Sequence, residues 1–541
     1  MISFNKAPIS LKTGAGIIVF SFLFLYFLCL IISAWITDDA FITLRTIDNF
    51  INGYGLRWNI SERVQAYTHP LWMFLLSIIY FFTREPYYST ITVSIIISLF
   101  TVYLLAFKIS TISNNSILIL IALIFSKAFV DYSTSGLENP LTHLLITIFF
   151  IISLGKDTDR KIVLLSLITS IAAINRMDSI LLLLPSLVFS IYKTGWRISI
   201  KQFLLGTIPL IAWISFSLFY YGFAFPNTAY AKLNNGINES ELISQGSYYL
   251  LNSFYMDPLT LPVILGGLVI PFLFKRNVFF PAAFGILFYL IYIVIIGGDF
   301  MSGRFLSSPF LIAIIILSQT ELRWRKTIIA LSVIVFLGLM APYPTIFSST
   351  TYGLGPKIVK GFRIGPYILT TFDNGIADER LFYYQFTGLL NHKKLKEHPW
   401  VKKAFQVKEE KSSPIVYTIA GIFGYYAGPQ IHIVDPWALG DPLLSKLPAT
   451  EYWRVGSKIQ PGEKWWRIGH FARKIPGGYL ETIKTGEKHL EDKSLREYYD
   501  KLLFVIKGDL FDTQRLKEII NLNFGKYDYL VNAYNSKLEH H

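Results

Sequence analysis

Two adjacent acids, Asp38 and Asp39, follow the first apolar segment of the chain, which carries no charge between Lys12 and Asp38. Carboxylates at the edge of a bilayer are costly to desolvate, so an acid pair at this place needs a reason. One reason is chemistry, because a general base that acts on a lipid-borne substrate must lie at this boundary. The alternative is a solvated helix N-terminus, where aspartate caps free amides. Asp38 and Asp39 are the first catalytic candidates.

Four further polar groups interrupt the apolar half of the chain. Three of them have a structural alternative: an acid that caps a helix, an arginine neutralised by a nearby aspartate, and a lysine that snorkels to the interface. Together they supply carboxylates beside cations that suit phosphate. The candidates are Glu138, Arg176 with Asp178, Asn227 with Lys232, and Asp299 with Arg304.

These residue types fit transfer from a lipid phosphate. Arginine or lysine would hold the phosphate and offset its developing charge, while an aspartate takes the proton of an attacking hydroxyl. Arg45 lies seven residues after Asp38, on the same face of a helix, where it would orient Asp38 or form an ordinary ion pair. His69 would contact phosphate or acceptor, or simply form a polar end of the next apolar segment. The chain has no Walker loop and no convincing dinucleotide-binding fingerprint.

The sequence makes no cofactor certain. Asp39 projects away from Asp38 on a helix, and its carboxylate oxygens would suit a divalent cation such as Mg²⁺ or Ca²⁺. The single cysteine, Cys29, lies inside the first apolar segment, so neither a disulfide framework nor a cysteine metal site is expected. The metal ligands are therefore unknown at the level of sequence.

The elements that must position these residues are membrane helices. Of the 541 residues, 52% are hydrophobic and only 16% are charged, which is too apolar for an ordinary soluble enzyme. The apolar blocks predict a polytopic helical membrane protein with about 11 spans. The positive-inside rule places the basic connections in the cytoplasm, which accounts for much of the net charge of +14 without nucleic acid. The acid pair, the four polar groups and the C-terminal part then lie outside.

The apolar blocks stop at residue 342. Strand-like segments at 415–419 and 431–434 and helical patterns at 495–506 and 513–520 predict a soluble α/β or α+β extracytoplasmic domain over 342–537. It would follow a transmembrane catalytic domain over 1–341, and residues 538–541 look like a tag remnant. Asp435, Asp441 and His470 would face the active site or bond between the domains. Four tryptophans would line an acceptor groove or pack in the core: Trp437, Trp453, Trp465 and Trp466.

Short motifs in order along the chain resemble the GT-C superfamily of polyprenyl-phosphate-dependent glycosyltransferases. The resemblance is greatest to the mycobacterial terminal arabinofuranosyltransferase family. Each motif is short, but together they cover most of the chain. They are 38–42 with Arg45, 53–59, 62–64, 68–72, 136–138, 176–178, 226–229 with Lys232, 297–301 with 303–304, 434–435, 439–444 and 466–473.

The resemblance implies a GT-C membrane core with an extracytoplasmic domain, and a catalytic base at Asp38 or Asp39. It also implies a decaprenyl-phosphate-type pentofuranose donor and an acceptor glycan, or glycoprotein, of the cell envelope. The expected place is the bacterial inner membrane, with the active site on its outer face. Two other functions remain as alternatives, a transporter or flippase of polyprenyl-linked sugar and a non-catalytic glycan-binding envelope protein.

Overall fold

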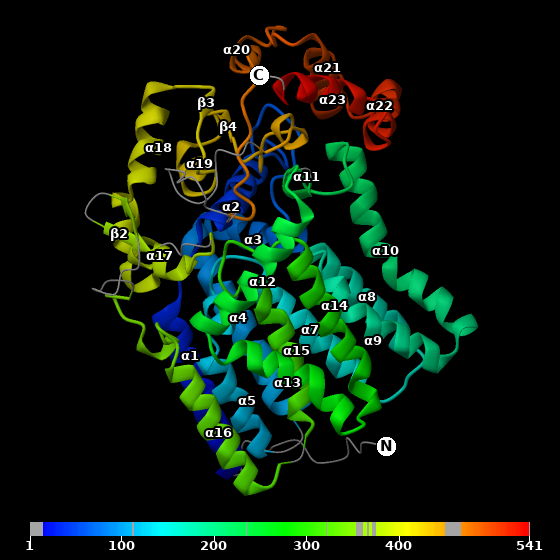
Figure 1. Ribbon diagram of the computed structural model, residues 1–541, viewed down its shortest axis with the longest axis vertical. Helices are drawn as coiled ribbons and strands as arrows, with labels where there is room; N and C mark the ends of the chain where they lie inside the picture. The colour runs from blue at the N-terminus through cyan, green and yellow to red at the C-terminus, as the bar shows by residue number, and fades with distance from the viewer. Residues whose placement is uncertain are drawn as a thin grey trace. The chain divides into compact units, whose positions relative to one another are not determined.

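Most of the chain is helical in a computed structural model that describes residues 14–110, 113–233, 235–320, 322–352, 361–364, 367–370, 375–449 and 467–539 (Figure 1). The chain folds into two compact units, each assembled from three stretches of sequence. The first unit contains residues 1–37, 87–210 and 242–394, and the second contains 38–86, 211–241 and 395–541. This division does not follow the expected boundary after residue 341. The separation into a membrane domain and a soluble domain stays a prediction.

The first unit is built from packed apolar helices. In Figure 1, α5 lies beside α1 and α16, and further helix pairs are α7 with α8, α9 with α14 and α13 with α15. A two-stranded antiparallel hairpin joins β1 (Gly361–Ile364) to β2 (Tyr367–Thr370). The helices are α1 (Gly14–Ser33), α4 (Pro86–Leu104), α5 (Ser113–Phe125), α6 (Lys127–Asp131), α7 (Asn139–Leu154), α8 (Lys161–Asn175), α9 (Ser179–Thr194), α13 (Thr260–Leu273), α14 (Phe280–Ile295), α15 (Ser307–Ser318), α16 (Trp324–Leu339) and α17 (Glu379–Thr387).

The second unit combines shorter helices with one small parallel sheet. Strands β3 (Ile415–Val416) and β4 (Ile433–Val434) pair Ile415 with Ile433. They lie within the two expected strand segments and are shorter than expected. The expected helices at 495–506 and 513–520 are confirmed as α21 and α22. The helices are α2 (Asp38–Ile51), α3 (Pro70–Thr83), α11 (Asn227–Leu233), α18 (Pro399–Glu410), α19 (Ile422–Ala427), α20 (Tyr479–Thr485), α21 (Lys493–Lys507), α22 (Thr513–Asn523) and α23 (Asp528–Glu539).

Two helices continue from one unit into the other, α10 (Trp196–Tyr221) and α12 (Glu239–Met256). By length and composition, four described helical segments can cross a membrane: Gly16–Ser33, Pro86–Ile109, Trp196–Tyr221 and Asn277–Ile295. The pair α12 and α13, bent by 112°, makes a fifth if it counts as one span, and six further apolar helices are shorter. The chain is therefore a helical protein of membrane character. The expected count of 11 spans is not confirmed.

Candidate active site

Asp38 is held by the backbone of the second unit. It opens α2, and its Oδ1 accepts a hydrogen bond from the N–H of Ile422 at 2.6 Å, while Oδ2 accepts one from Gly421 at 3.3 Å. A Cβ added to Gly421 would overlap the carbonyl oxygen of Asp38, so only glycine permits this approach. Each carboxylate oxygen of Asp38 thus accepts one backbone N–H, and the residue is 7% exposed.

The surroundings of Asp38 favour its protonated form. Burial raises the pKa of Asp38 to about 7, and the charges of Asp39 and Asp435 act in the same direction against the backbone amides, which lower it. A pKa near neutrality suits a general base, but a base must also reach the substrate hydroxyl. The buried carboxylate of Asp38, in which each oxygen accepts a backbone N–H, meets the first condition and not the second.

Asp39 lies one residue further on, on a different face of α2. Unlike Asp38, it is partly exposed. Of the four acids that the sequence nominated in this unit, the other three, Asp38, Asp435 and Asp441, are buried. Asp39 is therefore the nominated acid of this unit that is best placed to meet a substrate.

Arg45 links separate segments of the second unit through hydrogen bonds. Its Nε donates to the carbonyl of Trp58 at 2.8 Å, its Nη1 to the carbonyl of Gly424 and its Nη2 to the carbonyl of Ile431 at 2.8 Å. The guanidinium also lies over the Trp58 ring, 4.9 Å from its centroid. These donations replace the expected pairing of Arg45 with Asp38. A substrate contact by Arg45 stays a prediction without support from these contacts.

Asn227 and two acids of the C-terminal part hold the loop after β4. The Nδ2 of Asn227 donates to the carbonyls of Ala438 at 2.8 Å and Asp441 at 3.0 Å. The carboxylate of Asp435 accepts from the N–H groups of Trp437 and Leu439, and that of Asp441 accepts from Leu443, Leu444 and Tyr479. Burial raises the pKa of Asp435 to about 7 and that of Asp441 to about 6. These residues fix a loop, and a direct role at a substrate stays a prediction.

His69, Lys232 and His470 differ in accessibility. His69 precedes α3, is buried, and its Nε2 lies 2.7 Å from the Thr43 hydroxyl. Lys232, near the end of α11, is partly exposed, whereas the ring nitrogen Nδ1 of His470 is buried. Burial lowers the pKa of His470 well below its usual value, and the charges of Arg467 and Lys232 act in the same direction. The charge of Lys232 therefore acts at the His470 ring.

The tryptophans are only partly placed by the structure. Trp437 is partly exposed and packs edge-on against His470, with 4.2 Å between the ring centroids. Trp453, Trp465 and Trp466 lie outside the described residues. An aromatic acceptor groove stays a prediction.

Five nominated residues come together in the first unit. Glu138, at the start of α7, accepts from Arg176 at 2.8 Å and from Arg304 at 3.3 Å. Arg176 forms a two-pronged pair with Asp178 at 2.7 and 2.8 Å. Arg304 also lies 3.5 Å from the carboxylate of Asp299. Three acids and two arginines thus form one network with a net formal charge of −1, in which each arginine is already paired.

The first unit also contains a second buried ion network, which was not predicted from the sequence. Lys127 pairs with Asp131 and, at 3.0 Å, with Asp378, while the Nε of Arg380 lies 2.9 Å from Asp131. The Arg380 guanidinium also lies 3.9 Å from the ring centroid of Tyr352. A signal was present, because Lys127 and Asp131 stand four residues apart at the end of an apolar block.

This second network lies beside the loop that carries Asp299 and Arg304. The N–H of Ala377 donates to the carbonyl of Phe300 at 2.7 Å, and the N–H of Ser302 donates to the carbonyl of Ala377 at 2.9 Å. Asp378 follows directly and reaches Lys127. The network therefore helps to position that loop.

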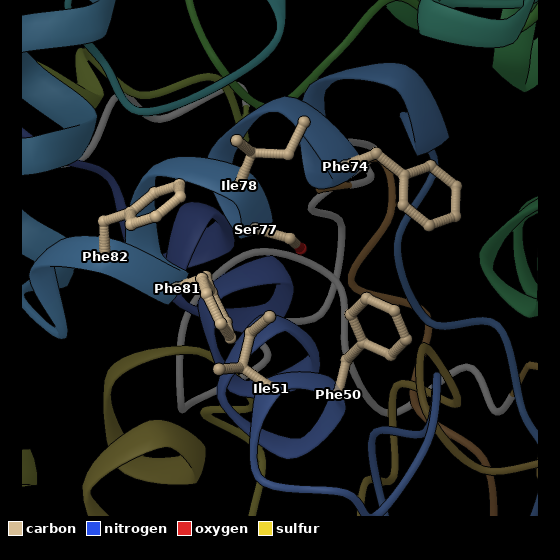
Figure 2. A pocket seen from close by; sticks show the side chains of 7 residues that line it. All are labelled: Phe50, Ile51, Phe74, Ser77, Ile78, Phe81 and Phe82. Carbon is tan, nitrogen blue, oxygen red and sulfur yellow. The ribbon is translucent and has the colours of Figure 1, made fainter.

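An apolar groove of about 270 Å³ opens in the second unit between the end of α2 and α3 (Figure 2). It begins eleven residues after Asp39, about 17 Å along the helix at the usual rise per residue. The hydroxyl of Ser77 is the only polar side-chain group on its wall. The groove is lined by Phe50, Ile51, Phe74, Ser77, Ile78, Phe81 and Phe82.

A metal site has no direct support in the geometry. Among the residues that the structure describes, no group of three or more His, Cys, Asp or Glu side chains could hold an ion. A divalent cation at Asp39 stays a prediction.

The comparisons with known proteins agree with the resemblance read from the sequence. No protein-family model matches the chain. The terminal β-(1→2)-arabinofuranosyltransferase of Mycobacterium tuberculosis is 25% identical over 417 residues, which are 65% of this chain and 63% of that protein. The enzyme of the same name from Corynebacterium glutamicum is 26% identical over 333 residues, 51% of this chain and 46% of that protein. The chain thus spans less than two thirds of either relative.

Two solved structures are also similar. They are the crystal structures of ArnT from Cupriavidus metallidurans, one bound to undecaprenyl phosphate and one in the apo state. Both have a TM-score of 0.45, with sequence identities of 12% and 13%. The matches cover 77% of this chain and 85% and 86% of those chains. The likeness to terminal arabinofuranosyltransferases, read from the motifs, is confirmed by the curated relatives.

Proposed function

We propose that this chain is an integral membrane glycosyltransferase that transfers an arabinofuranosyl or related pentofuranosyl group. The donor is a polyprenyl-phosphate sugar, and the acceptor is a glycan of the cell envelope on the outer face of the inner membrane. The observation that carries the proposal is the acid pair that opens α2, in which Asp38 is fixed and Asp39 remains partly exposed. The names of the curated relatives support the sugar.

In this proposal, Asp39 is the general base. It takes the proton from an acceptor hydroxyl as that oxygen forms a bond to the anomeric carbon of the donor. The bond between this carbon and the phosphate oxygen breaks, and the electron pair leaves with the polyprenyl phosphate. Asp38 acts as a positioning residue, because its amide contacts fix the start of α2.

Lys232 is the proposed contact for the departing phosphate. Among the nominated cations of the second unit, Arg45 is committed to backbone carbonyls, whereas Lys232 is partly exposed. A lysine ammonium near the leaving oxygens would stabilise the charge that develops there. The apolar groove of Figure 2 offers hydrocarbon-like surface on the helix that also carries the base, which is compatible with a lipid donor.

The test is transfer by the purified protein from synthetic polyprenyl-phosphate arabinofuranose to a panel of small glycosides. Asp39→Asn should lower turnover by about 10²–10⁴-fold, the usual contribution of a general base, and leave the unfolding midpoint near that of the parent. Asp48→Asn is the matched control, since this acid of α2 lies on another turn and accepts from Tyr80. It should retain turnover.

Two results would contradict the proposal. Parental turnover by Asp39→Asn would exclude this residue as the base. No transfer from any donor, combined with movement of the lipid-linked sugar across vesicles, would instead favour the flippase.

A further inference from the structure

Helix α22 presents an exposed apolar stripe. Leu516 and Ile520 of α22 and Phe524, the residue directly after it, are spaced by four residues and so share one face, and they are 42%, 59% and 86% exposed. The neighbouring face is buried through Arg515 and Ile519. One side of α22 therefore packs within the second unit, while an adjacent apolar side has no described protein cover.

The buried side of α22 is fastened to the end of α10, a candidate membrane span. Arg515 donates from Nη1 to the carbonyl of Phe219 at 2.8 Å and from Nη2 to the carbonyl of Tyr220 at 3.1 Å. Asn523 donates from Nδ2 to the carbonyl of Gly222 at 2.7 Å. These carbonyls belong to the last turn of α10 and the residue after it, where a helix has no intrahelical donors left. Both ends of α22 are thus tied to one place on α10.

This attachment sets the depth of α22 relative to a bilayer. The candidate span Trp196–Tyr221 ends at Tyr221, so a membrane that this helix crosses would have one surface near these last carbonyls. The ring of Phe511, 80% exposed, packs against that of Phe219, with 5.5 Å between centroids. Phe511, just before α22, therefore adds exposed apolar surface at the end of the candidate span.

Charges flank the stripe in a manner that suits lipid headgroups. Lys517 and Lys526 are both exposed, one within α22 and one just beyond it. Lysine beside an apolar helix face can place its stem on acyl chains and its ammonium among anionic headgroups. A membrane surface fits this combination of apolar stripe, flanking lysines and attachment to the end of a span.

We propose that α22 is an interfacial membrane anchor. Leu516, Ile520 and Phe524 lie at the boundary between headgroups and acyl chains of the membrane that α10 crosses, on the side where α10 ends. Lys517 and Lys526 contact anionic headgroups there. The anchor fixes the C-terminal helices at the membrane surface, and the inference does not depend on the transferase activity.

Site-directed spin labelling of the whole protein in vesicles of phosphatidylethanolamine and phosphatidylglycerol tests the anchor. Single cysteines replace Leu516, Ile520 or Phe524 in a Cys29→Ala background, and Gln514→Cys and Asn532→Cys are the controls because both positions are exposed and polar. Each labelled variant must keep the unfolding midpoint of the background. The accessibility of each spin label to oxygen and to a water-soluble nickel complex is measured. We expect the ratio of oxygen accessibility to nickel accessibility to be several-fold higher at 516, 520 and 524 than at the controls.

The remaining outcomes overturn the proposal. Nickel accessibility at the stripe equal to that of the controls would place the stripe in water. Low accessibility to both reagents would indicate a protein cover, such as a second copy of the chain. The same accessibility ratios are measured in a Lys517→Gln and Lys526→Gln double variant at different phosphatidylglycerol contents. If they change with phosphatidylglycerol content as in the parent, the proposed headgroup contacts of the two lysines are wrong.

Discussion

Asp38 and Asp39 are neighbours in sequence with different surroundings. The carboxylate of Asp38 is buried against two backbone amides, whereas Asp39 is partly exposed on another face of the same helix. Accessibility rather than residue type therefore separates the proposed base from the positioning residue. Arg45 is a structural residue by the same reasoning, because its guanidinium donates three hydrogen bonds to backbone carbonyls.

Asp38→Asn should destabilise the protein more at pH 5 than at pH 8. The folded chain holds the Asp38 proton up to about pH 7, whereas the unfolded chain loses it near 3.8. The contribution of this proton to stability is complete below the unfolded pKa and is lost as pH rises through 7. Asparagine does not titrate, so the difference in unfolding free energy between parent and variant should fall by on the order of 3 kcal/mol from pH 5 to pH 8.

Thermal unfolding of both proteins across this range checks the prediction. Glu518→Gln is the control, because hydrogen bonds to Tyr527 and Asn521 hold the pKa of Glu518 below its usual 4.5 in spite of burial, which raises it. Its contribution is lost only as pH falls below that value, so its effect should not change between pH 5 and 8. If the difference in unfolding free energy between the parent and Asp38→Asn is constant with pH, the pKa of Asp38 is not raised in the folded chain.

At the scale of elements, α19 and the start of α2 depend on one close approach. Gly421 brings the backbone against Asp38, and Gly424 lies one turn further on, beside Trp58 and Arg45. A side chain has no space at Gly421, whereas a Cβ at Gly424 would meet its nearest atom at 3.3 Å. The two glycines provide a matched test of this contact.

Gly421→Ala should lower transfer at least about tenfold, because the added methyl group displaces the start of α2 and with it Asp39. Gly424→Ala should retain most of the activity. Turnover with saturating donor, together with the unfolding midpoint, distinguishes a displaced base from a protein that fails to fold. Equal activity of both variants would show that the contact does not position the base.

The second ion network ties α6 to the start of α17. Arg380 is fully buried, so its removal leaves Asp131 with one cation fewer in a site closed to water. Arg380→Ala should lower the free energy of unfolding by about 3–5 kcal/mol. Lys488→Ala breaks an exposed pair with Asp500 and should cost about 0–1 kcal/mol. Denaturant titration measures the free energy of unfolding of both variants. Similar losses in the two variants would show that the second ion network does not stabilise the fold.

At the scale of the whole molecule, the second unit is assembled from three distant stretches of sequence. Arg45 from α2 donates to carbonyls of Gly424 and Ile431, Asn227 from α11 holds the loop at 438–441, and Arg515 from α22 holds the end of α10. The C-terminal stretch therefore lacks partners when it is alone.

A fragment of residues 395–537 should not fold by itself. It loses the donors of Arg45 and Asn227, and buried polar groups without partners are costly. Near-ultraviolet circular dichroism and amide exchange should show no fixed tertiary structure, in contrast to the full chain in a membrane mimic. A cooperative unfolding transition of the fragment would support the independent domain that the sequence predicted for 342–537.

Local patterns in the sequence determined the helices and the membrane character. An uncharged apolar run defines α1, and amphipathic periodicity gave α21 and α22 within a few residues of their bounds. Motif order was sufficient for the likeness to terminal arabinofuranosyltransferases, which the curated relatives confirm.

Only the tertiary structure decided which candidate residues use their side-chain polar atoms in hydrogen bonds and ion pairs within the protein. Glu138, Arg176, Asp178, Asp299 and Arg304 meet in one network although they span more than 160 residues of sequence. Asp38 meets Gly421 and Ile422 across more than 380 residues. Burial and hydrogen bonding at such separations depend on how distant helices pack, and residue type and spacing do not encode that packing.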